Sequence, residues 1–426
     1  MLLEKNLSKN KLKGNSKIAI IFSILVIVMP ILNCYKSPIP VLGLGEFSIV
    51  LLLPLMILSM LFSNKKIYLH KYWLFVFYSI ICSYVVVLFN EISLHEINNR
   101  LLRIVFYTFV VFILGFNFFN YELSMKVYRY TCLLACAFLI LQNISYSIFN
   151  FILPWKIPGI DFNILITTEE YFRKYYTNYR PTSLFTEPAQ FVQYCSPYLA
   201  LTLFNDSRRN MIEALFVSFA IILSSSVNGF IFVSIIWIVW FFYNMYIDRK
   251  LASILFRVIM IALVPVILIV LYNNSNNFVF IINRLNNINN DGSAIIRLTN
   301  GFSIFSQLDA VYKFVGIGFG SYDEFKVLHS INLLYDTEVE YMSSLSYILV
   351  SSGIFGFVLH AIILLDIYRK AQKVGKVLII LLMAMFISSS IYPSPIYVII
   401  LMFTLYSGKK VIREAKVNED YALNFK

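Results

Sequence analysis

The sequence predicts an all-α polytopic membrane protein. Three observations predict it: the apolar composition, the long uncharged intervals and the uneven placement of positive charge. Of the 426 residues, 59% are hydrophobic and 14% are charged, whereas soluble globular chains carry about 25% charged residues. Uncharged stretches of 18 residues or more recur along the chain, and about 20 helical residues cross the hydrocarbon core of a bilayer. We therefore expect residues 1–426 to form a single integral membrane domain.

Charged residues delimit ten uncharged intervals, each a candidate for one or two membrane spans. Eight have the length of one helix, but the two longest contain 34 and 32 residues. A single helix of that length would measure about 50 Å, which exceeds the core of a bilayer. The intervals are 18–35, 47–64, 72–90, 104–121, 130–155, 188–205, 214–247, 258–283, 341–365 and 377–408.

The two longest intervals are each interrupted by a run of turn-forming residues. The first contains Ser-Ser-Ser-Val-Asn-Gly at 224–229, and the second contains Tyr-Pro-Ser-Pro at 392–395. Such clusters mark turns rather than helix interiors. We therefore predict that each interval forms a hairpin of two helices, which gives about 12 transmembrane helices.

The distribution of positive charge supports this count. With twelve spans, the segments placed in the cytoplasm carry 23 Lys and Arg, and the short outer loops near 33–40, 90–103 and 392–394 carry 3. Cytoplasmic loops are enriched in these residues, so both termini are predicted to be cytoplasmic. With ten spans, this difference in Lys and Arg content between cytoplasmic segments and outer loops would be lost. The cytoplasmic segments are 1–17, 63–72, 120–130, 205–210, 247–253, 366–376 and 408–426.

Composition also excludes other classes of protein. The net charge of +12 does not indicate nucleic-acid binding, because Lys and Arg lie between the apolar runs instead of forming one basic face. The basic N-terminus and the apolar run at 18–32 lack a small-residue cleavage site, so we expect an uncleaved first span. No CxxC pair and no zinc-type His spacing occurs, so no metal site is predicted. The cysteines, expected to be buried as small apolar residues, are Cys34, Cys82, Cys132, Cys136 and Cys195.

Two long outer loops, 150–187 and 273–340, are predicted to hold the chemistry. In the first, Glu187-Pro188 is typical of a helix start, with a carboxylate near the positive helix end and Pro in the first turn. Arg180 lies at the outer interface, where its planar guanidinium can grip a diphosphate. The alternatives are that Glu187 only caps the helix and that Arg180 only reaches lipid headgroups.

The second loop is predicted to contain an amphipathic helix on the bundle mouth, capped by Asp291 or Ser293. Arg297 lies on it, either as a phosphate ligand or as a solvated charge. Glu340, where a later span begins, is either a capping carboxylate or a general base, and the lone His329 is more simply structural. The apolar face is expected to comprise Ala294, Leu298, Phe302, Phe305 and Leu308.

A glycine-rich stretch, Gly-Ile-Gly-Phe-Gly at 316–320, follows this helix. Such a stretch can expose backbone donors that bind phosphate, although a plain flexible turn is the simpler interpretation.

Five segments in this order resemble the O-antigen and capsule repeat-unit polymerases (the Wzy group) and the related O-antigen ligases. The resemblance covers the plan of spans and large outer loops. The ligases carry a His-Asn pair before the Gly-Ile-Phe-Gly helix, and residues 339–342 (VEYM) lack it, which favours the polymerases. The segments are RPTSLFTEPAQF at 180–191, SSVNGF at 225–230, SAIIRL at 293–298, VGIGFG at 315–320 and SSGIFGF at 351–357.

The resemblance implies that the chain joins undecaprenyl-diphosphate-linked repeat units on the outer face of the cytoplasmic membrane. It also implies a GT-C-like fold by analogy, contact with membrane lipids, and a chain-length regulator as a further partner. We expect Arg180, Arg297 and, more weakly, Arg284 to bind diphosphate, and Glu187 or Glu340 to act as the base. The scheme requires no nucleotide, cofactor or metal. The alternatives are an O-antigen ligase and a flippase for lipid-linked oligosaccharide, although almost no charge lies within the spans.

Overall fold

The computed structural model of the chain is built from helices. Among the described residues, the single ladder pairing is an isolated bridge between Lys36 and Gly43. By contact, the chain divides into two compact units, residues 1–128 with 293–426, and residues 129–292. Each unit is described by itself. The structure describes residues 2–39, 41–63, 69–90, 92–154, 159–161, 179–204, 210–247, 296–331 and 342–407.

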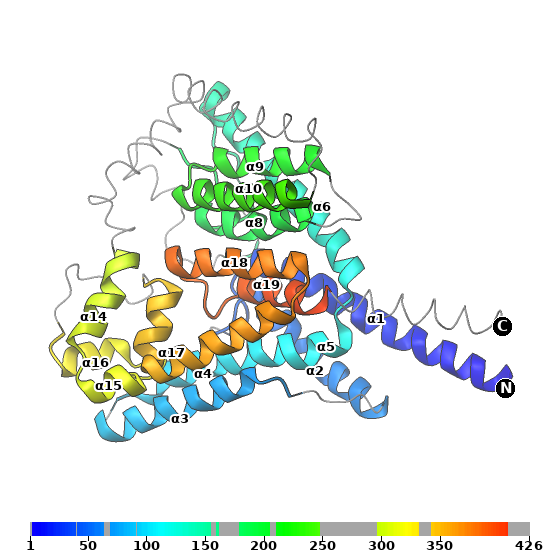
Figure 1. The fold of residues 1–426 in the computed structure, drawn as a ribbon. Coiled ribbons are helices and arrows are strands. Elements are labelled where there is room, and N and C mark those ends of the chain that lie inside the picture. Colours follow the sequence, from blue (N-terminus) through cyan, green and yellow to red (C-terminus); the bar gives the residue numbers. More distant parts are fainter. Residues whose placement is uncertain are drawn as a thin grey trace. The chain divides into compact units, whose positions relative to one another are not determined.

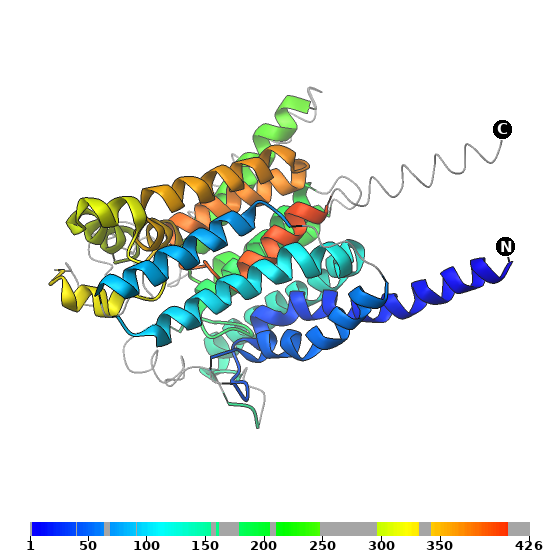
Figure 2. The same cartoon turned by 90° about the horizontal axis from the view of Figure 1, so that it is seen from below.

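The first unit contains both the N-terminal helices and the C-terminal helices (Figures 1 and 2). α17 packs against both α3 and α18, and α18 packs against α19. Its elements are α1 (Leu2–Leu32), α2 (Leu44–Phe62), α3 (Tyr72–Asn90), α4 (Leu94–Phe109), η1 (Val110–Leu114), α5 (Gly115–Phe118), η3 (Ile296–Asn300), α14 (Gly301–Gln307), α15 (Ala310–Val315), α16 (Tyr322–Leu328), α17 (Ser344–Lys370), α18 (Lys373–Ser388) and α19 (Pro395–Tyr406).

The second unit begins inside the long helix α6 (Tyr121–Phe149). It also contains α8 (Pro188–Phe204), α9 (Met211–Leu223) and α10 (Val227–Ile247). α8 packs against both α9 and α10. At one end of this unit, Arg129 forms an ion pair with Glu213, which also accepts a hydrogen bond from the Tyr198 hydroxyl at 3.0 Å. These contacts join α6, α8 and α9.

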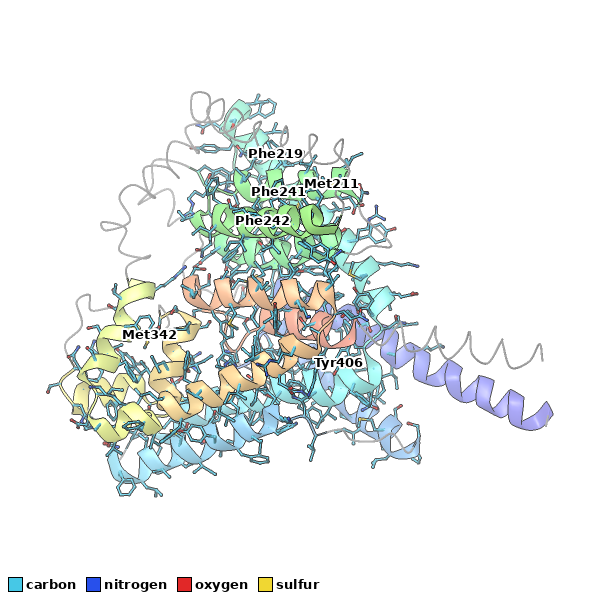
Figure 3. All side chains as sticks on the ribbon, in the orientation of Figure 1. Met211, Phe219, Phe241, Phe242, Met342 and Tyr406 are labelled. Atoms are coloured by element: carbon cyan, nitrogen blue, oxygen red, sulfur yellow. The ribbon has the colours of Figure 1, made fainter. Side chains whose placement is uncertain are left out.

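Five helical segments of the described residues are long and apolar enough to cross a membrane, so the chain is an all-α membrane protein. Large apolar side chains are exposed on these helices and on the shorter apolar ones. Phe219 on α9 and Phe242 on α10 are examples, both labelled in Figure 3. Extensive exposed apolar surface marks contact with lipid. The five segments are Leu44–Phe62, Tyr72–Asn90, Leu94–Phe118, Tyr121–Phe149 and Ser344–Lys370.

Both predicted helix breaks are confirmed. α9 ends at Leu223 and α10 begins at Val227, and the turn between them includes Ser225 with a φ of 54°. α18 ends at Ser388 and α19 begins at Pro395. In α19 the proline occupies the first turn, where its missing N–H costs nothing.

The turn between α18 and α19, where a short outer loop is predicted near 392–394, is packed inside the first unit. Ile391 and Tyr392 are buried, with 1% and 5% of their surface exposed. The Ser344 hydroxyl at the start of α17 accepts hydrogen bonds from both of their amides, at 2.7 and 3.0 Å. Because α17 supplies the partners for these backbone groups, the turn packs inside the unit and does not require water.

Candidate functional site

Arg180 contacts a second segment that the family resemblance singled out. Its Nη2 atom donates a hydrogen bond of 3.1 Å to the backbone carbonyl of Ser225, in the turn between α9 and α10. Arg180 is half-buried. A guanidinium bonded in this way is held in one orientation while keeping its remaining N–H donors in a planar fork. The segment at 180–191 and the segment at 225–230 therefore form one local arrangement.

The segment that follows Arg180 is fixed to α6 at Ser183. The Ser183 amide donates to Gln142 Oε1 at 2.8 Å, and the Ser183 hydroxyl donates to the Ala135 carbonyl at 2.6 Å. Gln142 Nε2 also donates to the Ser183 carbonyl at 3.4 Å. Ser183 and Gln142 are fully buried. Ser183 has a φ of 57°, an uncommon conformation for a residue other than glycine, so these bonds define the shape of the loop.

Glu187 precedes α8, as predicted. Its carbonyl accepts hydrogen bonds from the amides of Gln190 and Phe191, at 3.1 and 3.3 Å, and the helix begins at Pro188. The Glu187 side chain is exposed, and it makes no hydrogen bond or ion pair with the part of the chain that the structure describes. The carboxylate is therefore available to accept a proton from a bound hydroxyl.

Arg297 belongs to the other unit. It lies in η3, and its carbonyl accepts a hydrogen bond of 3.1 Å from the amide of Ser343. Its side chain is partly exposed. The contact places η3 against the start of α17.

The prediction of which residues form the apolar face of the helix near Arg297 is partly wrong. The buried residues are Gly301, Ile304 and Leu308, whereas Phe302 is 46% exposed. The physical reason is that η3 is a π-turn, which holds more residues per turn than an α-helix. It shifts the register of every residue that follows. The expected caps, Asp291 and Ser293, lie outside the described residues.

Two further candidates, Arg284 and Glu340, also lie outside the described residues. The structure nevertheless identifies the N-cap of α17. The Ser343 hydroxyl accepts a hydrogen bond of 3.3 Å from the amide of Ser346. The Ser343 hydroxyl therefore holds the capping position of α17.

The interpretation of residues 316–320 as a phosphate-binding loop is also wrong. The amides of Gly316, Ile317 and Gly318 donate to backbone carbonyls of Tyr312, Val350 and Ser351, at 2.8, 3.1 and 2.9 Å. The amide of Phe319 donates to the Ser83 hydroxyl at 2.9 Å. These four donors are already used inside the protein. The segment instead attaches the second loop to α17 and α3.

The carbonyls that hold this segment become available because α17 breaks. Gly353, inside α17, has a φ of 63° and a ψ of −175°, which interrupts the helical hydrogen bonds. The Tyr78 hydroxyl on α3 lies 2.9 Å from the Val315 carbonyl and 3.0 Å from the Ser352 carbonyl, and donates into the same junction. The break therefore joins three segments of the unit through main-chain groups.

His329 lies near this junction without belonging to it. Its Nε2 atom is 3.0 Å from Asn90 Oδ1, and its ring stacks on Phe325 with 4.0 Å between centroids. The ring is exposed. These contacts agree with the structural role expected for a lone histidine.

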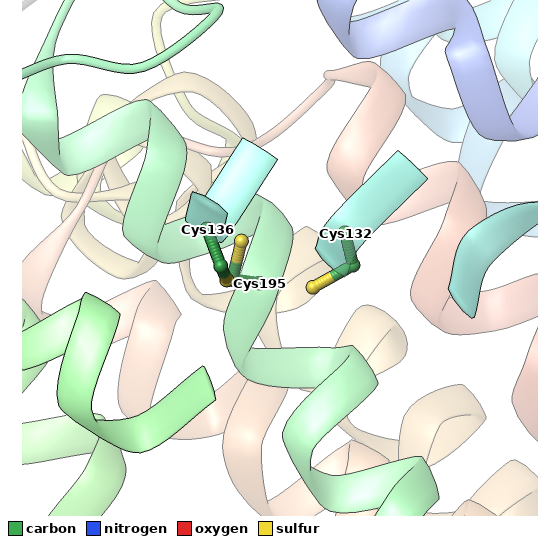
Figure 4. A group of neighbouring side chains, drawn as sticks. All are labelled: Cys132, Cys136 and Cys195. Atoms are coloured by element: carbon green, nitrogen blue, oxygen red, sulfur yellow. The ribbon is translucent and has the colours of Figure 1, made fainter. Parts of the chain in front are cut away.

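The sequence analysis missed one cluster of side chains. The sulfurs of Cys132, Cys136 and Cys195 all lie within 4.8 Å of one another (Figure 4). The spacing of four residues between Cys132 and Cys136 places both on one face of a helix, which was the available signal. The approach of Cys195 depends on the packing of α8 on α6 and has no counterpart in the sequence.

No protein-family model matches the chain, and no curated protein matches it. The assignment of a function therefore depends on the motif segments and on their geometry.

Proposed function

We propose that the chain is a polymerase of lipid-linked oligosaccharide repeat units, with O-antigen or capsular polysaccharide as its product. The observation that carries the proposal is the hydrogen bond from Arg180 to the Ser225 carbonyl. It joins two segments, 45 positions apart, that each resemble the polymerases. A second such pair supports it, since Gly318 donates to Ser351. Segments of one site are expected to meet in this way.

The reaction forms a glycosidic bond and breaks the bond to the lipid diphosphate. A hydroxyl of the acceptor repeat unit attacks the anomeric carbon of the donor glycan, and undecaprenyl diphosphate leaves. The leaving group gains negative charge, which guanidinium groups in a partly dehydrated site stabilise. We assign this role to Arg180 and Arg297, with Arg284 as a weaker third.

The acceptor hydroxyl must lose a proton as the new bond forms. Glu187 is exposed beside the start of α8 and is the candidate base, with Glu340 as the alternative.

We further propose that the chain has about twelve spans in the cytoplasmic membrane, with both termini in the cytoplasm. Single cysteines at Ser207→Cys and Ser253→Cys test this count with an impermeant thiol reagent. The five native cysteines are buried, so background labelling in intact cells is expected to be low. Twelve spans require both sites to react only after the cells are opened. Labelling of one site in intact cells would favour ten spans.

Glycan length tests the proposed activity. Cells lacking the native gene are complemented with Arg180→Ala, Arg297→Ala or the wild-type chain, and the amount of each protein in the membrane is measured. Arg369→Ala is the matched control, because Arg369 is exposed in the last turn of α17. We expect single-repeat glycans with the first two variants and long polymer with the control. Long polymer with both test variants would overturn the site assignment.

Two alternatives give different outcomes. If the wild-type chain restores attachment of a polymer that otherwise accumulates unattached, the ligase replaces the polymerase. The flippase is favoured by one observation, the buried His360 within α17, whose Nε2 has no hydrogen-bond partner among the described residues. Ionisable groups inside spans often mark transport pathways. Chain growth by purified protein from preloaded lipid-linked repeats, without any membrane gradient, would exclude a pure transporter.

A further inference from the structure

Three thiols converge at the interface between α6 and α8. Cys132 and Cys136 come from successive turns of α6, and Cys195 comes from α8 (Figure 4). All three side chains are fully buried. The residues just before Cys132 and Cys195 also meet, because the Thr131 and Tyr194 hydroxyls lie 2.7 Å apart. The two helices are therefore held in one register at this level.

The separation of the sulfurs fits a shared metal ion. Metal–sulfur bonds of about 2.3 Å in a trigonal plane would place the three sulfurs about 4 Å apart. The observed sulfurs all lie within 4.8 Å of one another, so small side-chain rotations suffice. A disulfide requires an S–S distance of about 2.05 Å and would use only two of the three thiols.

The number and type of ligands indicate which metal ion the cluster can bind. Among the described residues, no fourth His, Cys, Asp or Glu joins the cluster. Structural zinc is almost always four-coordinate, so it is a poor match. Thiolate ligands favour soft ions, Cu(I) among them.

We propose that Cys132, Cys136 and Cys195 form a binding site for a soft monovalent cation, Cu(I). Binding releases the protons of the coordinating thiols to solvent, because cysteine binds metal ions as the thiolate. The charge of the ion partly neutralises the buried thiolates, which would be strongly unfavourable without it. The site does not depend on the proposed polymerase activity.

The position of the cysteines assigns a structural role to this ion. Ala135, between the two cysteines of α6, accepts the hydrogen bond from the Ser183 hydroxyl. An ion shared by α6 and α8 would therefore fix the two helices on either side of the Arg180 segment. Bound ions that require the folded state stabilise that state.

Copper retention by the purified full-length protein tests the proposal. The reduced chain in detergent receives Cu(I) without oxygen, and a coloured Cu(I) chelator then competes for the ion. We expect one Cu(I) per wild-type chain, and affinity weakened roughly 100-fold by Cys132→Ala, Cys136→Ala or Cys195→Ala. Cys34→Ala and Cys82→Ala are the matched controls, since both residues are buried outside the cluster, and should retain the ion fully.

A second measurement uses only the wild-type chain, in case the variants fold poorly. The copper-loaded and copper-free proteins are exposed to an alkylating reagent at the lowest denaturant concentration at which all five cysteines of the copper-free chain react, and the modified cysteines are identified by mass spectrometry. Copper should protect the three clustered cysteines and leave Cys34 and Cys82 reactive. Equal modification of all five cysteines, copper retention that survives removal of the cluster, or retention of Zn(II) but not Cu(I) would each overturn the proposal.

Discussion

Gly316 and Gly353 lie backbone against backbone. A Cβ atom added to Gly353 would lie 2.5 Å from the Gly316 nitrogen, and one added to Gly316 would lie 2.6 Å from the Gly353 nitrogen. Both residues have positive φ, at 95° and 63°. Neither neighbour can move aside as a flexible side chain would, because each obstructing atom belongs to the main chain. The pair allows a loop segment to enter the break in α17.

Gly353→Ala is expected to destabilise the first unit by about 2 kcal/mol or more, since it combines an unfavourable φ with a steric clash. Gly159→Ala is the matched control. Gly159 also has a positive φ, of 85°, but a Cβ added there meets nothing within 4 Å, so the φ penalty alone of about 1 kcal/mol is expected. Unfolding in mixed micelles measures both values. Equal losses for the two variants would show that the close approach at Gly353 contributes nothing.

Ser344→Ala removes the side chain that holds the turn between α18 and α19. The Ser344 hydroxyl accepts from the amides of Ile391 and Tyr392, and it donates to the Ser389 carbonyl at 2.9 Å. Leaving these buried groups unpaired is expected to cost roughly 2–4 kcal/mol. The control is Ser388→Ala, whose hydroxyl donates to the Ala384 carbonyl of its own helix and lies 3.4 Å from the neighbouring Ser389 hydroxyl, with an expected loss below about 1 kcal/mol. A similar stability for both variants would contradict this assignment.

Gln142→Leu is expected to loosen the segment that carries Arg180. The substitution leaves the buried amide and carbonyl of Ser183 without their partner, which is expected to cost about 1–3 kcal/mol. Limited proteolysis should then cut near Ser183 more rapidly, and under the proposed function the glycans should become shorter.

Asn143→Leu is the matched control for Gln142. Within the part of the chain that the structure describes, its side chain bonds only to Ser147, one turn along the same helix, so proteolysis and glycan length should match wild type. If Gln142→Leu accelerates proteolysis but leaves glycan length unchanged, the anchoring of the segment is confirmed and its role in polymer formation is wrong.

Stability should depend on His70 at mildly acidic pH. Burial lowers the pKa of His70, and the nearby Asp366 partly opposes this effect. The ring stacks on Phe112, with 4.4 Å between centroids, and Nδ1 accepts from the Tyr72 amide at 3.2 Å, a bond that a protonated Nδ1 cannot accept. In the unfolded chain the pKa is about 6.5, so the unfolded state binds the proton more tightly.

The free energy of unfolding is therefore expected to fall as pH decreases from about 6.5 toward the lowered pKa of folded His70, and to level off below it. His70→Phe keeps a ring for the stack on Phe112 but cannot titrate, so this part of the pH dependence should disappear. A variant that retains the full wild-type slope would show that other groups cause it.

Much of the helical plan could be predicted from the sequence, because the breaks use residues with local preferences. The serines near Ser225 and the prolines near Pro395 end helices regardless of what packs around them. The π-turn at η3 and the break at Gly353 could not be predicted in the same way. Their geometry depends on partners distant in the chain, such as Val315 and Tyr78.

Only part of the candidate site could be predicted from the sequence. The position of Glu187 before α8 follows from a local pattern, and the structure confirms that start. The bond between Arg180 and Ser225 joins two loops through a carbonyl, and every residue has a carbonyl. A hydrogen bond of this kind requires no particular residue type or spacing. It can therefore be identified only in the structure.

The junction at Gly353 also bears on how such chains diverge. The groups that hold residues 316–318 to α17 are amides and carbonyls, which every substitution except proline retains. Ile317 and Phe319 are completely buried, so their size matters more than their identity. Descendants of one ancestor could replace most side chains in this region and keep the same attachment, provided that the two touching glycines remain. Selection would then preserve the architecture while erasing much of the sequence that encodes it.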